Sequence, residues 1–281
     1  MVTLSEKVGS SANWSANLLA LARVIFGFLV SRHGTEQVFN YPEPSGALLA
    51  SYEGVLGLVS LPGGLLLMLG LFTRSVGLVL GIMYGLFWFI GPLHSGLTQG
   101  HYVFGARGGG DEAALNWFFF LYLSTTAAGV WSLDRYRKHD RMAAEPSPWT
   151  PYALGVLRIA AGFFFFHHGL EKWFGISGGR ADINFTTLRG VAGFLELTGG
   201  SLLMLGLFSR QAAFILSGQM AVAYFTSWAP MGFWRSFSQP NYIAAIQNCF
   251  LFLFLSAAGP GMWSLARVLA RRRLLTGQPL T

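Results

Sequence analysis

The chain has 281 residues, of which 53% are hydrophobic and only 11% are charged, with a formal net charge of +7 at pH 7. Soluble domains carry roughly 25% charged residues, so this composition excludes an ordinary soluble domain and indicates an integral membrane protein. The basic residues flank hydrophobic segments and form no patch interleaved with aromatic residues, which argues against a nucleic-acid partner.

Eight segments are candidates for membrane spans, because a spanning helix needs about 20 mostly apolar residues. We therefore predict an all-α, polytopic membrane protein whose partner is the lipid bilayer. Pro92 and Pro230 lie near the ends of the third and seventh segments, and we expect these spans to be shorter or bent. In chain order the predicted spans are 17–38, 52–72, 75–93, 113–132, 151–173, 188–208, 211–229 and 243–263.

The predicted spans form two groups of four with related sequences. Residues 54–74 and 190–210 are identical at 14 of 21 positions. The repeat has the size of a small domain, so we interpret the chain as two fused four-helix bundles. The predicted parts are an N-terminal segment (1–16), a first half (17–135), a basic linker (136–150), a second half (151–266) and a basic tail (267–281).

The distribution of Lys and Arg predicts the topology. Most basic residues lie in the segments 134–141 and 266–273. By the positive-inside rule, both termini and the linker are cytoplasmic and the two halves insert in the same, parallel orientation. We therefore expect a multi-pass protein of a bacterial-type inner (plasma) membrane. The polar residues 1–16 do not resemble a secretory signal, and we expect them to be retained.

The first span of each half carries an Arg, two glycines and a polar residue on one helix face. Two small residues on a stripe allow another backbone to approach, which predicts a helix–helix interface. The positions are Arg158, Gly162, Phe165, Gly169 and Lys172 in the second half, and Arg23, Gly27, Val30, Gly34 and Gln37 in the first.

Glu196 lies within a predicted span and is the best functional candidate in the chain. A carboxylate at membrane depth is costly and should be protonated, paired or in contact with water. We expect Arg158 to pair with it, since their vertical separation of roughly 8 Å is within the combined reach of the side chains. The alternative is that Arg158 and Arg23 snorkel to the lipid headgroups.

Other polar residues at membrane depth are candidates for proton exchange or ligand binding. His168 and its counterpart His33 are expected near the outer boundary, either as hydrogen-bonded interfacial residues or in proton exchange with a quinol. They lack the converging ligands of a metal site, so we predict no metal. Amide side chains either connect helices or bind quinone carbonyls; they are Asn116, Asn248, Gln219 and Gln247. The single cysteine, Cys249, excludes an intramolecular disulfide.

The order of the motifs ARVIFG…HGTEQVF, LRIAAG…HHGLEKWF, ELTGGSLLMLGLFSR, LSGQMAVAYFTSWAP and AAGPGMWSL resembles the DoxX family of four-helix membrane proteins, here as a tandem duplication. The resemblance covers roughly 18–135 and 151–266. It implies a link to membrane redox processes. Similar proteins include a small membrane subunit of thiosulfate:quinone oxidoreductase and a membrane partner in thiol and superoxide defence.

Each half departs from the family pattern at different positions. Glu196 and Lys172 in the second half correspond to Ser60 and Gln37 in the first, whereas Glu112 has an apolar counterpart in the second half. Redox coupling to a quinone needs a proton donor or acceptor near the reacting oxygen. We therefore predict that any functional pocket lies in the outer leaflet of the second half, lined by His168, Lys172, Glu196 and Gln219.

Two functions from different classes remain. The first is a membrane subunit of a redox system that binds quinone, or a soluble or periplasmic oxidoreductase, with no intrinsic cofactor. The second is a non-catalytic scaffold or receptor for a partner protein. A transporter is disfavoured because the repeats are not inverted. The first function requires a lipid-accessible polar pocket, whereas the second is compatible with a closed apolar bundle; whether the protein is catalytic stays open.

Overall fold

The structure, a computed structural model, describes residues 4–41, 48–99, 110–126, 129–136, 145–176, 180–231 and 240–276, and these residues form helices and connecting turns without strands. The first half contains α1 (Leu4–Phe39), α2 (Tyr52–Leu69), α3 (Thr73–Trp88), η1 (Phe89–Leu93), α4 (His94–Gln99), α5 (Gly110–Thr125) and η2 (Leu133–Tyr136). The second contains α7 (Thr150–Phe174), α8 (Leu188–Leu205), α9 (Ser209–Ala223), η4 (Tyr224–Trp228), η5 (Ala229–Met231) and α11 (Pro240–Ala258), followed by α12 (Leu265–Thr276).

Helix length and composition confirm a multi-pass, all-α membrane fold. Within the described ranges, 5 helical segments are long and apolar enough to cross a membrane. They are Trp14–Phe39, Tyr52–Leu69, Thr73–Thr98, Thr150–Phe174 and Leu188–Leu205, and α11 contains the shorter apolar stretch Ile243–Ala258. The number of eight spans therefore stays a prediction. The same holds for the orientation, because most residues of the linker (137–144) and the loop that carries Arg235 lie outside the described residues.

Several helix boundaries differ from those predicted from hydropathy. The helix of the fourth predicted span ends at Thr125 rather than at 132, and that of the eighth at Ala258 rather than at 263. Gly259 follows with a φ of +84°, a conformation that glycine adopts readily and that ends a helix. The apolar residues after each helix therefore form turns, because backbone conformation, and not hydropathy, sets these ends.

The third predicted span also differs. We expected it to end at 93 near Pro92, but Pro92 lies within the π-helix η1 and the chain continues as α4 to Gln99. In the second half the corresponding helix passes into the π-helix η4 before Pro230. A π-helix accommodates the missing proline N–H by shifting the hydrogen-bond register. The N-terminal segment differs as well, since α1 begins at Leu4 and includes most of it.

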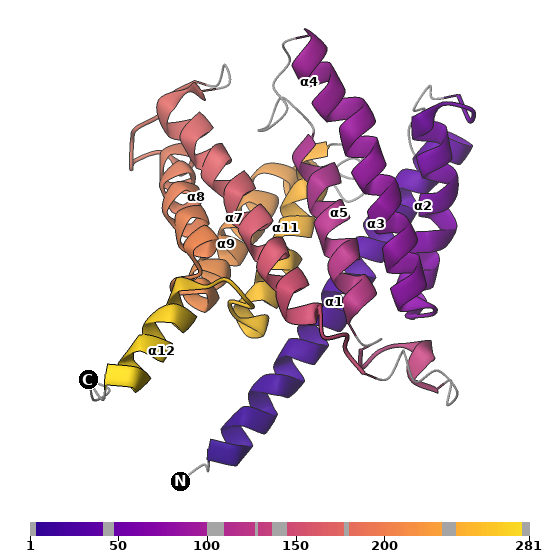
Figure 1. Cartoon of the computed structure of the whole chain (residues 1–281). Coiled ribbons are helices and arrows are strands. Elements are labelled where there is room, and N and C mark those ends of the chain that lie inside the picture. Colours follow the sequence, from indigo (N-terminus) through magenta and orange to yellow (C-terminus); the bar gives the residue numbers. More distant parts are fainter. Residues whose placement is uncertain are drawn as a thin grey trace.

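The two halves lie side by side, and both chain ends emerge at the same end of the molecule (Figure 1). In the first half α1 packs on α2, α2 on α3 and α3 on α5; in the second, α7 packs on α8, α8 on α9 and α9 on α11. The halves meet through α1 with α11 and through α5 with α7. This pattern is unchanged when the halves are exchanged, as expected for bundles related by a pseudo-two-fold axis.

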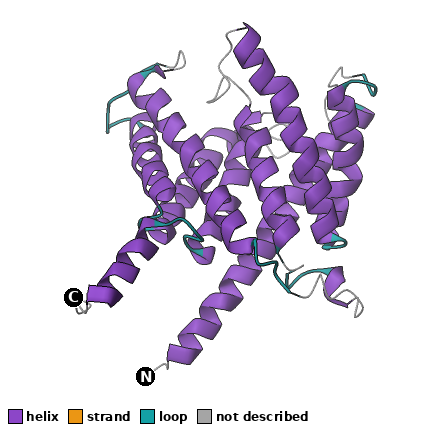
Figure 2. Ribbon diagram, in the orientation of Figure 1, coloured by secondary structure: helices purple, strands orange, loops and turns teal. Residues whose placement is uncertain are grey.

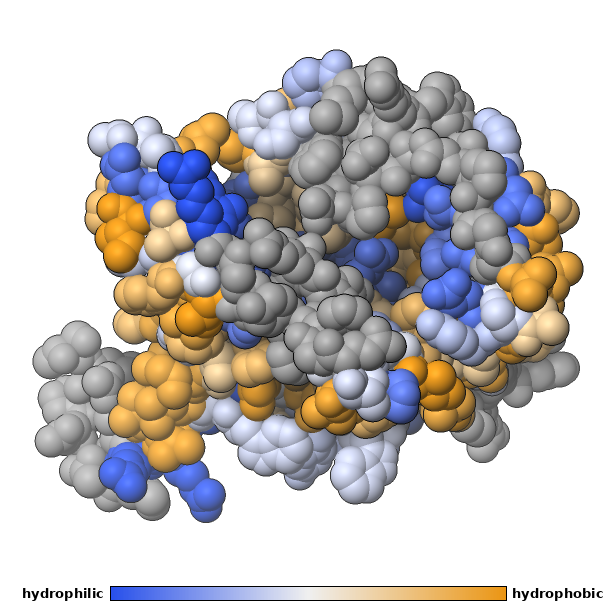
Figure 3. Space-filling view, turned by 90° about the horizontal axis from the view of Figure 1, so that it is seen from above, coloured by the Kyte–Doolittle hydropathy of each residue, from blue (hydrophilic) through white to orange (hydrophobic). Residues whose placement is uncertain are grey.

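Aromatic side chains fill the core of each half. The ring centroids of Phe26 on α1 and Phe119 on α5 are 3.9 Å apart, and those of Phe165 on α7 and Phe252 on α11 are 4.4 Å apart. The outer helices α2, α3, α8 and α9 surround this core (Figure 2). Seen from above, hydrophobic residues lie around the periphery (Figure 3), as expected for a surface in contact with lipid.

The predicted glycine interface is confirmed in both halves. A Cβ atom on Gly34 would lie 2.4 Å from the backbone nitrogen of Leu61, and one on Gly169 would lie 2.4 Å from that of Leu197. Such distances are shorter than any real contact, so only glycine permits α1 to approach α2 and α7 to approach α8 this closely. This close approach brings the side chains of α7 within reach of polar groups on α8.

Candidate functional site

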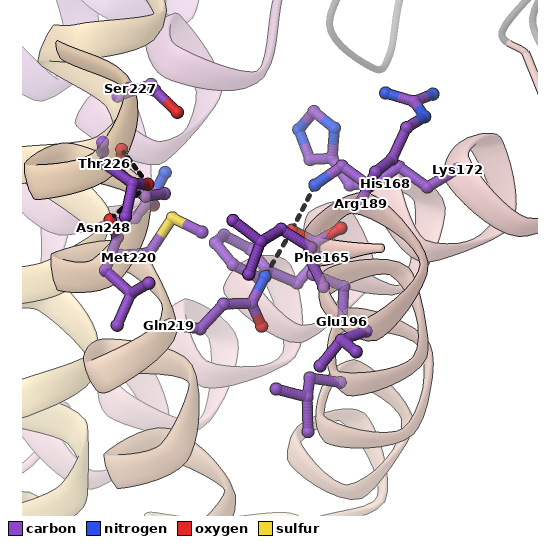
Figure 4. Close-up of a pocket in the computed structure, with 18 residues that line it drawn as sticks. Phe165, His168, Lys172, Arg189, Glu196, Gln219, Met220, Thr226, Ser227 and Asn248 are labelled. Atoms are coloured by element: carbon purple, nitrogen blue, oxygen red, sulfur yellow. Dashed lines mark hydrogen bonds and ion pairs between the residues drawn. The ribbon is translucent and has the colours of Figure 1, made fainter. Parts of the chain in front are cut away.

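A cavity of about 770 Å³ lies in the second half, enclosed by α7, α8, α9, η4 and α11 (Figure 4). Its wall is mostly apolar, with side chains such as Phe165, Leu195 and Met220. The polar residues that line it are His168, Lys172, Arg189, Glu196, Gln219, Thr226, Ser227 and Asn248. Two of these, Thr226 and Ser227, come from the π-helix η4, a backbone form that is common at functional sites.

Glu196 is only 1% exposed and forms the centre of the polar group. Its Oε1 atom lies 2.5 Å from Nζ of Lys172 and accepts a hydrogen bond of 2.7 Å from Nε2 of Gln219. Figure 4 shows the two donors approaching the carboxylate from opposite sides. Glu196 shares the buried face of α8 with Gly193 and Gly200, so the small residues that bring α7 close also direct the carboxylate toward Lys172.

The expected Arg158–Glu196 pair is wrong, and so is the snorkelling alternative. Arg158 is completely buried. Its Nη1 donates to the carbonyl of Leu203 at 2.8 Å, and its Nη2 donates to those of Trp263 and Met262 at 3.1 and 3.2 Å. The carbonyl of Leu203 also accepts from the backbone N–H of Gly206, and it belongs to the negative end of the α8 dipole, which attracts a cation.

Arg23 occupies the corresponding place in the first half. It is 1% exposed, and its Nη2 donates to the carbonyl of Trp131. A Cβ atom on Gly70 would collide with Arg23, as one on Gly206 would collide with Arg158. Both arginines therefore connect a first helix to the end of the second helix and to the turn after the fourth helix.

His168 connects the cavity to the other half of the molecule. Its Nε2 lies 2.9 Å from Oδ2 of Asp111, and its Nδ1 lies 4.0 Å from Oε2 of Glu171. Asp111 belongs to the first turn of α5 in the first half. Sequence reasoning missed both carboxylates. For Asp111 the available signal was its position beside Glu112 at the start of an apolar helix.

The structure brings together five of the six main candidates and leaves the sixth apart. Glu196, Lys172, Gln219, His168 and Asn248 line the cavity, whereas Arg158 does not. The secondary candidates are not among the lining residues: Arg23, His33, Glu112 and Asn116 all belong to helices of the first half.

The cavity is partly open at the surface of the bundle. Its lining includes Val191 on α8, Val222 on α9 and Leu188, which are 36%, 52% and 70% exposed. In a membrane such apolar, exposed side chains face lipid. Basic side chains, Lys172 and Arg189, lie on the same cavity wall as apolar ones. The arrangement can hold an amphipathic molecule that enters from the bilayer and presents oxygen acceptors.

Comparison with known proteins identifies a family for this region. Residues 153–228 match the DoxX family model. A protein of Haemophilus influenzae that is described as uncharacterized is 46% identical over 81 residues, which cover 27% of this chain and 60% of that protein. The chain thus spans about 60% of the length of this relative. No solved structure matches the chain significantly. The family match includes α7, α8, α9 and η4, the elements that form most of the cavity wall.

Proposed function

Because the chain belongs to the DoxX family through its second half, we propose that it is a membrane subunit of a redox system that binds quinone in the cavity beside Glu196. The observation that carries this proposal is a cavity with mostly apolar walls, partly open at the surface of the bundle, that holds the polar group around Glu196. A closed apolar bundle would have favoured a scaffold or receptor without a ligand. Quinone would be a ligand from the bilayer, and the partner would be a soluble or periplasmic oxidoreductase.

The residues of the cavity fit a quinone. Apolar walls suit a ring and an isoprenoid tail, and side-chain donors such as Lys172 and Asn248 suit the two carbonyl oxygens. Three acceptor atoms in the wall are buried without a hydrogen-bond partner, Oε2 of Glu196, Oε1 of Gln219 and Oδ1 of Asn248. Buried polar atoms are normally paired, so these three support a site completed by water or by the hydroxyl groups of the reduced quinol, which can donate.

A bound quinone supplies two-electron chemistry coupled to two protons. The part of this chain is to hold the headgroup and to exchange protons beside it. Glu196, held by Lys172 and Gln219, would anchor the polar side of the site beside the headgroup. His168, with Asp111 and Glu171 beside it, lies on the same wall and offers a group that exchanges protons.

The test is to purify the protein in mild detergent and to analyse bound small molecules and proteins by mass spectrometry. Binding of short-chain ubiquinone and menaquinone analogues is then titrated by quenching of tryptophan fluorescence. We expect Glu196→Gln to weaken binding roughly tenfold, the equivalent of one lost polar interaction of about 1.4 kcal/mol. The matched control is Ser60→Ala at the corresponding position of the first half, which we expect to bind as the wild type does.

Equal affinity in both variants would contradict a quinone site at Glu196. A protein that purifies without quinone, binds no analogue and retains a stoichiometric protein partner would instead support the scaffold.

A further inference from the structure

α12 leaves the helical bundle at the end where both chain termini lie, and it extends away from the other helices (Figure 1). Its side chains are exposed over the described part of the helix. Val268 and Leu269 are 49% and 44% exposed, and Arg267 and Arg271 are exposed as well. A helix with exposed apolar and basic residues in a membrane protein requires a surface that accommodates both.

Aromatic residues mark the membrane boundary directly beside the start of α12. The ring of Tyr152 lies 5.8 Å from that of Trp149 and 5.6 Å from that of Trp263, centroid to centroid. Trp149 and Trp263 are 68% and 59% exposed. Exposed tryptophan and tyrosine at span ends are typical of the headgroup region. Because α12 begins two residues after Trp263, it starts at the level of the lipid headgroups.

The charge of α12 has one sign. Its sequence, LARVLARRRLLT, contains four arginines and no acidic residue. Arg267 and Arg271 are four positions apart and share a face. Leu265, Val268 and Leu269 share the opposite face together with Arg272, whose long side chain reaches the headgroups from an apolar stem. Such helices lie in the interface, where apolar residues enter the acyl boundary and arginines contact anionic headgroups.

The corresponding turn of the first half is different. There Asp134 accepts hydrogen bonds of 2.8 Å from the backbone N–H groups of Phe72 and Thr73 and thereby binds the turn to the start of α3. The aligned residue of the second half is Ala266, which has no carboxylate. The second half thus lacks both the acidic charge and the side-chain attachment at this position.

From this position, charge and exposure we propose that α12 is a surface-binding helix for anionic phospholipid, held in the headgroup layer by its arginines. This proposal is independent of the quinone site, which lies elsewhere in the second half. The arginines neutralise lipid phosphates. The exposed valine and leucines exchange contacts with water for contacts with acyl chains.

The experiment measures the environment of α12 in the full-length protein. A nitroxide label is attached at Leu269→Cys, on the apolar face of α12, in a Cys249→Ser background, and the protein is placed in nanodiscs of phosphatidylcholine alone or mixed with phosphatidylglycerol. The ratio of oxygen to nickel-chelate accessibility reports the depth of the label. A label at Leu97→Cys, at the opposite end and 77% exposed in the wild type, is the matched control.

We expect the Leu269→Cys label to move into the lipid environment only with phosphatidylglycerol, and the Leu97→Cys label to be unaffected. Replacing Arg267, Arg271 and Arg272 with Gln should reduce membrane association of the helix roughly a hundredfold, at roughly fivefold for each arginine. High salt should act in the same direction. Equal water exposure in both lipids, or lipid contact that survives the three substitutions, would overturn the proposal; the first result would leave the helix as a surface for a soluble partner.

Discussion

The two halves are built alike at the end of the molecule that carries the termini and differ within the bundle, at the site of the cavity. At the end that carries the termini, Arg23 and Arg158 occupy equivalent positions and donate to backbone carbonyl groups. At the site of the cavity, the pair Lys172–Glu196 corresponds to Gln37 and Ser60. Ser60 is completely buried and lies against the hydroxyl group of Tyr84 on α3, so the neighbour of this position is a neutral tyrosine and not a lysine.

This comparison separates architecture from function. The helix ends, the glycine contacts and the buried arginines occur twice because each bundle needs them to close its turns. α2 and α8, for example, both begin with a hydroxyl side chain that accepts from the third backbone N–H, and both end at a glycine in the left-handed conformation. The ionisable pair occurs once, beside the cavity. A feature that the packing does not require twice is the better candidate for chemistry.

The largest effect is expected from the buried arginines. Arg158→Met should destabilise the protein by roughly 3–5 kcal/mol, because each buried carbonyl that loses its donor costs about 1–3 kcal/mol. Arg23→Met should also destabilise it, but less, because Arg23 donates fewer hydrogen bonds to carbonyl groups than Arg158 does. Thermal unfolding in detergent, followed by tryptophan fluorescence, measures both. A variant that unfolds at the wild-type temperature would show that its half does not depend on this arginine.

An intermediate effect is expected when the second half is converted to the residues of the first. Glu196→Ser should cost roughly 2–3 kcal/mol because Lys172 loses its partner in a mostly buried site, and Lys172→Gln should cost a similar amount. The double variant should be more stable than the sum of the single losses predicts, by roughly 1–3 kcal/mol.

Unfolding of the four proteins of this double-mutant cycle gives the coupling energy directly. If the losses of unfolding free energy in the two single variants simply add in the double variant, the 2.5 Å contact between Lys172 and Glu196 contributes no interaction energy of its own.

The smallest effect is expected at the turn after the fourth helix. Asp134→Ala should cost roughly 1–2 kcal/mol, because the carboxylate accepts from two N–H groups at the start of α3. The reverse change, Ala266→Asp, should stabilise the second half by up to about 1 kcal/mol, since an acidic residue also suits the N-terminus of α12. The same unfolding assay applies. Loss of stability in Ala266→Asp would show that the two turns are not interchangeable.

The candidate site was predictable from sequence in composition but not in its contacts. The cost of a carboxylate in the membrane identified Glu196 as a buried, paired residue, and the asymmetry between the halves identified Lys172 as a residue of the same region. The partner was assigned wrongly. Helix rise placed Arg158 within reach of Glu196, but vertical distance does not say which group a buried guanidinium meets first, and the carbonyl groups of Leu203 in α8 and Trp263 after α11 lie beside it.

Asp111 shows a second limit. Its contact with His168 joins residues of different halves through the packing of α5 on α7. Periodicity places residues on faces of one helix, but it does not say which helix of the other half covers that face. The site in the second half thus includes a residue of the first, a composition that no repeat-by-repeat alignment shows.

The amino-acid sequence by itself determined that this protein is an all-α membrane protein that resembles the DoxX family, because hydrophobicity, glycine spacing and motif order are properties of the linear chain. It also determined which helix faces carry glycine, because α-helical geometry is regular. Only the tertiary structure decided where the helices end, which donors surround Glu196 and that a cavity lies beside it. These depend on backbone conformation and on contacts between helices distant in sequence, which local patterns do not encode.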